Sequence, residues 1–242
     1  MAIQRPAAAV IGHANFGYEG VAVRIGIIGA GNIGGTLTRR FAALGHDVFV
    51  ANSRGPETLE DLTAATGARP VTVEEAAHSG DVVVVTIPEG RISQLPPELF
   101  EDVSRSIAVI DTGNYYPRQR DGRIHEIENG MTESCWVEMK LGRPVIKAFN
   151  SIYAEHLLER GKPAGSPGRI ALPVAGDDAA AKAVVMRLVD ELGLDPVGAG
   201  RLDESWRQQP GTPVYGTDFD APGVRKALSE ASKERTPEWS AS

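Results

Sequence analysis

The stretch Val23-Arg-Ile-Gly-Ile-Ile-Gly-Ala-Gly-Asn-Ile-Gly34 decides the fold of this chain. Its first half is an apolar run of strand length, and three glycines follow it. The first glycine allows a tight turn, the second lets a pyrophosphate approach the backbone, and the third lets a helix pack against the strand. The start of that helix offers free N–H groups to an anion. The stretch therefore predicts a dinucleotide-binding βαβ unit, with a pyrophosphate at Gly29, Ala30, Gly31, Asn32, Ile33 and Gly34.

Strands and helices are expected to alternate along most of the remaining sequence. Apolar runs typical of buried parallel strands occupy residues 23–28, 47–51, 82–86, 107–110 and 145–149. Helical spacing or helix-start signals mark residues 33–44, 56–66, 73–79, 154–160 and 177–192. A later strand at 169–175 contains Pro173, which restricts it to a sheet edge or a bulge. The sequence predicts an α/β, doubly wound Rossmann fold with a mostly parallel sheet and a small α/β C-terminal extension.

Length and composition are consistent with one full-sized α/β core. The chain has 242 residues, of which 42% are hydrophobic and 24% are charged. We expect an N-terminal extension at 1–22, a dinucleotide-binding domain at 23–160 and a small α/β subdomain at 161–242. The stretch Gly161–Gly168, rich in Gly, Pro and Ser, is the predicted linker between the last two.

Charge and cysteine content exclude several classes of function. A net charge of −7 argues against non-specific binding to nucleic acid or to an anionic membrane surface. The single cysteine, Cys135, excludes an intrachain disulfide and a cysteine-based metal site, so we expect no metal and a reducing compartment, by default the cytoplasm. No transmembrane run or signal peptide is recognisable. A homodimer is the usual expectation for a compact enzyme.

The end of the second strand determines the choice of cofactor. NAD-specific folds place there an acidic residue that binds the ribose hydroxyls, whereas this chain has Asn52-Ser-Arg-Gly55. Ser53 offers a hydroxyl, and Arg54 offers a planar, permanently charged guanidinium suited to a 2′-phosphate. Asp47 begins the strand and Glu57 lies in the next helix, so neither is well placed as the ribose acid. Asn52, Ser53 and Arg54 therefore predict NADP(H).

These features, with three further motifs, resemble the reductases related to NADPH-dependent deazaflavin (coenzyme F-420) reductase, a group that includes the cytosolic domain of membrane ferric reductases. The further motifs are Asn52-Ser-Arg-Gly-Pro-Glu-Thr-Leu59, Asp111-Thr-Gly-Asn-Tyr-Tyr-Pro117 and Lys147-Ala-Phe-Asn150, and the resemblance extends from Val23 to Leu228. It implies a compact enzyme that passes hydride between NADPH and an acceptor stacked on the nicotinamide. It leaves the acceptor open, with coenzyme F-420 or a flavin as second cofactor or substrate.

Other polar and aromatic residues follow strands and should meet at the carboxyl edge of the sheet. Thr86, Ile87, Pro88, Asn114 and Asn150 are the predicted neighbours of the nicotinamide. Tyr115 and Tyr116 could stack on a flat acceptor, or could simply pack, while the two asparagines could instead cap turns. Trp206 lies in an irregular stretch, 201–220, expected to be a loop that either covers the acceptor or packs in a subunit interface.

Acid–base machinery is scarce, and we assign no catalytic residue. None of the five histidines pairs with a carboxylate at a recognisable spacing, and a turn-forming role explains Asp111. Hydride transfer to a flavin or deazaflavin needs mainly positioning, so an NADPH-dependent oxidoreductase with such an acceptor is the first hypothesis. The alternatives are a redox sensor that binds NADPH without turnover and a reductase of a small carbonyl or imine. The latter class normally adds a long helical domain, for which about ninety residues after Asn150 leave little room.

Overall fold

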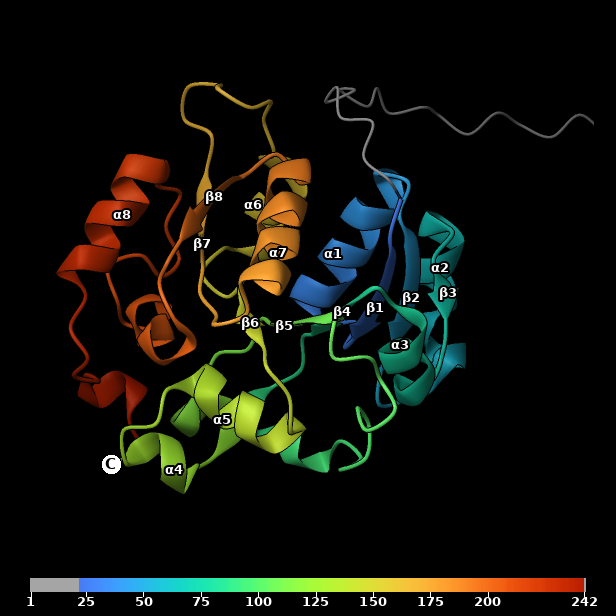
Figure 1. Cartoon of the computed structure of the whole chain (residues 1–242), viewed down its shortest axis with the longest axis horizontal. Coiled ribbons are helices and arrows are strands. Elements are labelled where there is room, and N and C mark those ends of the chain that lie inside the picture. Colours follow the sequence, from blue (N-terminus) through green and yellow to red (C-terminus); the bar gives the residue numbers. More distant parts are fainter. Residues whose placement is uncertain (1–21, 242) are drawn as a thin grey trace, which may run out of the picture.

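A computed structural model describes residues 22–241, so the predicted N-terminal extension lies outside the described residues except for its last position. Figure 1 shows the parallel sheet at the centre of the fold. Its six strands run in the order β3-β2-β1-β4-β5-β6. Their bounds are β1 (Arg24–Ile28), β2 (Asp47–Ala51), β3 (Arg69–Pro70), β4 (Val82–Val85), β5 (Ala108–Asp111) and β6 (Ile146–Lys147). The order reverses between β1 and β4, which is where open α/β sheets bind ligands. The predicted Rossmann fold class is confirmed.

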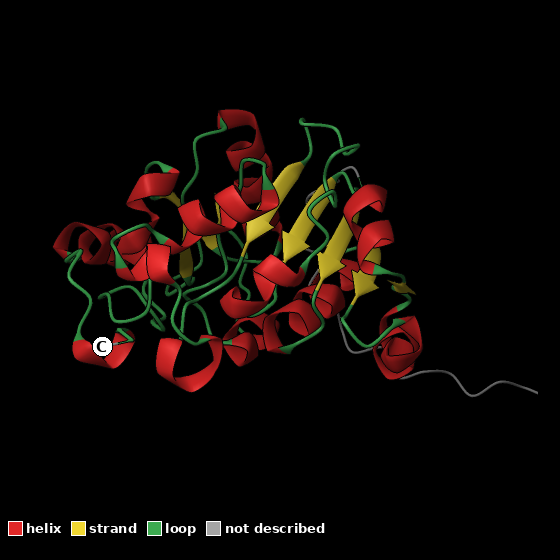
Figure 2. Ribbon diagram, turned by 90° about the horizontal axis from the view of Figure 1, so that it is seen from below, coloured by secondary structure: helices red, strands yellow, loops and turns green. Residues whose placement is uncertain are grey.

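Helices cover both faces of this sheet (Figure 2). One face carries α1 (Asn32–Ala43), α6 (Ala154–Glu159) and α7 (Ala179–Glu191), with α2 (Glu60–Thr66) beside α1. The other face carries α3 (Val73–Ser79) and α5 (Glu133–Leu141), with α4 (His125–Glu128) next to α5. Both faces of each central strand are therefore buried, which explains why these strands read as continuous apolar runs.

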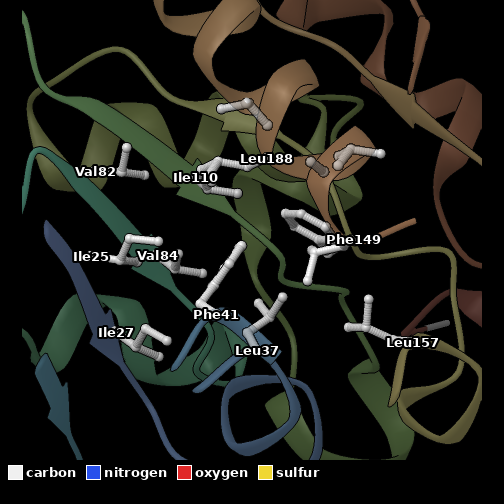
Figure 3. Close-up of a cluster of buried hydrophobic side chains, with 14 of the residues drawn as sticks. Ile25, Ile27, Leu37, Phe41, Val82, Val84, Ile110, Phe149, Leu157 and Leu188 are labelled. Atoms are coloured by element: carbon white, nitrogen blue, oxygen red, sulfur yellow. The ribbon is translucent and has the colours of Figure 1, made fainter. Parts of the chain in front are cut away.

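The main hydrophobic cluster joins the two halves of the chain. Leu37 and Phe41 of α1, Leu188 of α7 and the strand residues Ile27 and Val84 belong to this one cluster (Figure 3), and all five are fully buried. Burial of each such side chain contributes about 1.5–3 kcal/mol. Because residues on both sides of position 160 share this cluster, the two halves have a common core; the domain boundary at 160/161 stays a prediction.

The C-terminal part forms a second, two-stranded parallel sheet from β7 (Ala171–Val174) and β8 (Asp195–Gly198), followed by α8 (Ala221–Glu230). Pro173 lies in β7, which has β8 as its only strand partner within that sheet, as the edge position predicted for this proline requires.

Several elements escaped prediction. They are the short strands β3 and β8, the helices α4, α5 and α8, the π-helix η3 (Pro117–Asp121), and the 3₁₀ helices η2 (Glu89–Gln94), η4 (Leu202–Gln208) and η5 (Pro237–Trp239). The expectation of a loop across 201–220 is wrong for its first third, where η4 buries Leu202 and Ser205. Across the described part of the chain, residues 22–241, no helix has both the length and the apolar character needed to cross a membrane.

Candidate cofactor site

The glycine turn after β1 has the geometry that its sequence predicts. Gly29 has a φ of 112°, and a Cβ atom placed there would lie 2.3 Å from the carbonyl oxygen of Thr86. A Cβ atom at Gly34 would lie 1.9 Å from the carbonyl oxygen of Gly29. At Gly31, by contrast, a Cβ atom would meet nothing within 4 Å. Gly29 and Gly34 thus allow close packing of strand, turn and helix, whereas Gly31 faces open space.

The start of α1 is suited to an anion in that space. Its N-cap is Gly31, which has no side chain to cap the helix. The first turn contains no acidic residue. The first N–H groups of a helix have no partner within it, and the helix dipole places partial positive charge there. The turn and the helix start therefore fit a pyrophosphate, which would lie against Gly31.

A cavity of about 690 Å³ opens beside this turn. Its volume is in the range of small-molecule and cofactor sites. It brings together three of the predicted segments, the glycine turn, the end of β2 and the end of β4. Its lining residues are Ile28, Gly29, Ala30, Gly31, Asn52, Ser53, Arg54, Val73, Glu74, Thr86, Ile87, Pro88, Arg91, Gln94, Leu95 and Pro96. Asn32, Ile33 and Gly34, predicted with the turn, form the first residues of α1 and do not line the cavity.

The turn after β2 presents Ser53 and Arg54 to solvent. Asn52 organises it, because its Oδ1 accepts a hydrogen bond from the Arg54 backbone N–H (2.8 Å) and its Nδ2 donates to Thr58 Oγ1 (2.8 Å). Both side chains that follow Asn52 are exposed and line the cavity. The structure thus gives Asn52 a role in shaping the turn, while Ser53 and Arg54 are free to bind.

The two acidic residues near this turn are placed away from the ribose position. Asp47, at the opposite end of β2, pairs with Arg69 at 2.7 Å. Glu57 folds its carboxylate back toward Gly55 and does not line the cavity. The cavity wall at the end of β2 therefore carries a cation and no carboxylate, which favours a 2′-phosphate over a free ribose hydroxyl.

Asn114 and Asn150, predicted at the nicotinamide end, bind one another and do not line the cavity. Asn114 Nδ2 donates to the Asn150 backbone oxygen (2.9 Å), and Asn150 Nδ2 donates to Asn114 Oδ1 (3.0 Å). Asn150 Oδ1 also accepts from Gln208 Nε2 (3.0 Å), and only 4% of Asn150 is exposed. These amides brace the loops after β5 and β6 against η4. In the loop after β6, Phe149 precedes Asn150 and has a φ of 62°, which is unusual for a bulky residue.

The aromatic acceptor candidates are separated in the structure. Tyr115 is fully buried, and its hydroxyl accepts from the Ile124 N–H at 2.9 Å, so the expectation that it stacks on an acceptor is wrong. Burial raises the pKa of Tyr115 to about 12, which keeps the phenol neutral. Trp206 lies on η4 and lines a different cavity, of about 360 Å³, that shares no lining residue with the first.

Tyr116 is half-buried and belongs to an aromatic group at the C-terminal tail. Its hydroxyl contacts that of Tyr215, and its ring centroid lies 5.7 Å from that of Trp239. The Arg120 guanidinium lies 4.8 Å from the Tyr116 ring centroid. Of the three candidates, Tyr116 is the one that lies in the loop after β5 and is not fully buried.

A buried ion pair lies beneath that loop. Lys147 Nζ donates to Asp111 Oδ2 (3.0 Å) and to the Gly113 carbonyl (2.6 Å), and both charged residues are at most 1% exposed. Asp111 also accepts from Ser134 Oγ (2.7 Å) and from the Gly113 N–H (2.8 Å). Burial opposes the charge on Lys147, but attraction to Asp111 and other carboxylates outweighs it and raises the lysine pKa. The turn-forming role predicted for Asp111 is present, and the ion pair adds to it.

Glu89 is a second buried acid at this edge of the sheet, and no motif in the sequence predicts its burial. It follows Pro88 directly, is 0% exposed, and neither carboxylate oxygen has a hydrogen-bond partner among the described residues. Burial, together with repulsion from Asp111, raises its pKa well above the usual range. The surroundings of Glu89 therefore favour its protonated form, and the side chain is enclosed by the protein rather than exposed to the cavity.

Comparison with known proteins agrees with this arrangement. The family described as NADP oxidoreductase, coenzyme F420-dependent, matches residues 24–115. YjhV of Escherichia coli (strain K12) is 51% identical over 71 residues, which are 29% of this chain and 52% of YjhV, so the match spans about half of that relative.

Two solved structures extend the likeness over most of the chain. SMa0349 of Sinorhizobium meliloti, described as a hypothetical protein, is 30% identical with a TM-score of 0.68, covering 81% of this chain and 94% of its own. A candidate F420-dependent NADP reductase from Arthrobacter sp. FB24 is 22% identical with a TM-score of 0.62, covering 74% and 86%, and shows the shared fold. The chain belongs to the family described as NADP oxidoreductase, coenzyme F420-dependent, and is an NADP-dependent oxidoreductase.

Proposed function

We propose that this enzyme passes hydride between NADP(H) and a flavin-like or deazaflavin acceptor, with coenzyme F420 as the first acceptor to test. The observation that carries the proposal is the enclosure of the acid–base groups near the loops after β4 and β5, where the nicotinamide end would lie. The cavity that would hold the phosphates of the dinucleotide has Arg54, Glu74 and Arg91 as its ionisable side chains. A reaction between two redox cofactors needs mainly positioning, whereas reduction of a carbonyl needs a proton donor near its oxygen.

The acid–base groups near the loops after β4 and β5 are enclosed. Lys147 and Glu89 are 0% exposed, and Lys147 is already held by Asp111 and Gly113. Tyr115 is equally buried and hydrogen-bonded. Lys147 and Tyr115 are thus held by hydrogen bonds, and Glu89 is enclosed away from the cavity, which supports the cofactor-type acceptor over a small carbonyl or imine.

The proposed placement of NADP(H) follows from the same residues. Gly31 and the start of α1 would bind the pyrophosphate, and Ser53 and Arg54 would bind the 2′-phosphate. Thr86, Ile87 and Pro88 would border the nicotinamide ribose at the end of β4. When bound, NADPH supplies the hydride; the protein supplies orientation. Beyond this cavity, Asn114 and Asn150 would hold the loops at the nicotinamide end, and Tyr116 would form part of the acceptor wall.

An acceptor panel tests the proposal. The purified protein is mixed with NADPH and, separately, with oxidised coenzyme F420, FMN, FAD, ferric chelates, quinones and a small ketone or imine, while absorbance at the nicotinamide band is followed. We expect oxidation of NADPH with the deazaflavin or a flavin. Turnover with the ketone or imine alone would overturn the acceptor class. Tight NADPH binding with no oxidation by any acceptor would instead indicate a redox sensor.

The assembly and location of the protein stay predictions. A homodimer in the cytoplasm is still expected, and light scattering on the purified protein measures its oligomeric state.

A further inference from the structure

Part of the large cavity is used by neither proposed phosphate site. It is formed by the first turn of α3, by η2 and by the residues after η2, namely Val73, Glu74, Arg91, Gln94, Leu95 and Pro96. None of these belongs to the glycine turn or to the turn after β2. A dinucleotide held at those two turns still has to place its adenine ring, and this part of the wall is available to it.

Sheet topology places two guanidinium groups on opposite walls of the cavity. Strand β1 lies between β2 and β4, pairing with both. Arg54 follows β2, and Arg91 follows β4. The 2′-phosphate belongs at the end of β2, where Rossmann folds read the adenosine ribose. The adenine attached to that ribose therefore extends into the space between the ends of β2 and β4, toward Arg91.

The surroundings of Arg91 are suited to a flat base. Leu95 and Pro96 contribute apolar surface to the same cavity. Arg91 is exposed, and its Nη1 donates to Gln94 Oε1 at 2.9 Å, which fixes one edge of the guanidinium and leaves its faces open. In residues 22–241 we find no carboxylate paired with Arg91. A guanidinium of this kind stacks well on an aromatic ring.

Glu74 argues against a phosphate at the same place. It is the carboxylate of this part of the cavity, at the first turn of α3. A second anion beside it would be repelled, whereas adenine is neutral and carries an amino group that can donate to an acceptor.

We propose that Arg91 is an adenine-stacking residue, which binds NADPH and NADH equally, whereas Arg54 selects NADPH through the 2′-phosphate. This inference rests on the cofactor placement proposed above. Because adenine is common to both dinucleotides, the loss of Arg91 should weaken both by the same factor. The loss of Arg54 should not.

Fluorescence titration of NADPH and NADH tests this with three variants. Arg91→Ala should weaken both dinucleotides equally, by about 3- to 30-fold, the range of a cation–π contact. Arg91→Phe should retain most of the affinity, because a ring also stacks on adenine. Arg105→Ala, an exposed arginine outside the cavity, is the matched control and should change neither.

Two outcomes would overturn the assignment. A loss confined to NADPH would make Arg91 a phosphate ligand, and unchanged affinity for both would place its side chain away from the cofactor. Titration of Arg54→Ala in parallel tests the proposed 2′-phosphate site separately. Loss of that site should weaken NADPH more than NADH, whereas loss of the adenine site should weaken both equally.

Discussion

The carbonyl oxygen of Gly29 lies 1.9 Å from the position that a Cβ atom at Gly34 would occupy. The turn after β1 and the first turn of α1 are thus in backbone contact, and no side chain fits between them. This contact sets where the helix starts, and so where its free N–H groups meet the cavity.

Replacing Gly34 should therefore damage the fold as well as the site. Gly34→Ala forces α1 away from the turn, and we expect a loss of about 1–3 kcal/mol in the free energy of unfolding, the usual cost of overpacking. Gly35→Ala is the matched control, because its Cβ atom would be 3.6 Å from the Ala30 carbonyl oxygen, an ordinary contact. That variant should be unchanged or stabilised by up to about 1 kcal/mol, since alanine favours helix. Urea unfolding measures both, and equal stability would contradict the packing described.

Gly31→Ala should separate binding from folding. A Cβ atom there meets no protein atom within 4 Å, so stability should stay close to that of the unmodified chain. The methyl group would enter the space proposed for the pyrophosphate, and NADPH should bind at least about tenfold more weakly. Thermal unfolding and NADPH titration of the same preparation check the two halves. Unchanged affinity would show that the pyrophosphate lies elsewhere.

The buried pair of Lys147 and Asp111 should be costly to break from one side. Lys147→Met leaves the Asp111 carboxylate buried without its counter-charge, and we expect a loss of about 3–5 kcal/mol in unfolding free energy. Lys147→Met combined with Asp111→Asn should recover a large part of it, because no charge stays buried. Arg24→Met, which breaks the exposed pair with Asp81, is the control and should leave the unfolding midpoint almost unchanged. A double variant no more stable than Lys147→Met would contradict this explanation.

Glu89 should make stability fall as the pH rises. Its pKa in the folded protein is raised above the ordinary value of 4.5, so the folded state keeps a proton that the unfolded chain loses. The stabilisation that comes from this retained proton is complete below pH 4.5 and is lost as the pH rises toward the raised pKa of the folded state. Glu89→Gln cannot ionise, so its stability relative to the unmodified chain should improve steadily as the pH is raised through the range above 4.5. The exposed Glu98→Gln should show no such trend in urea unfolding across that range. A flat difference for Glu89→Gln would contradict the burial of an acid there.

The sequence predicts the fold class because the features that define this class are encoded by residues close together in the chain. The glycine turn, the apolar strands and the spacing of Leu37 and Phe41 each depend on residues close together in the chain. The same holds for Ser53 and Arg54, which follow directly from the end of β2. These features are confirmed as parts of one fold and one cavity.

Other features depend on contacts between distant residues and carried no local signal. Asn150 binds Gln208, 58 positions later, and Tyr115 is covered by segments from α4 and the C-terminal tail. Arg91 reaches the cavity because a short 3₁₀ helix follows β4, a turn that periodicity does not reveal. From the sequence alone the Tyr115 ring is expected to be accessible, because no residue nearby in the chain shows which segments bury it.

The selectivity of the Arg54 variant tests the central claim most directly. In equilibrium titrations, Arg54→Ala should weaken NADPH about 10- to 100-fold, the loss of charge-assisted hydrogen bonds to a phosphate. NADH affinity should change by no more than about twofold. Equal weakening of NADPH and NADH, or no change in either, would contradict a 2′-phosphate site at Ser53 and Arg54.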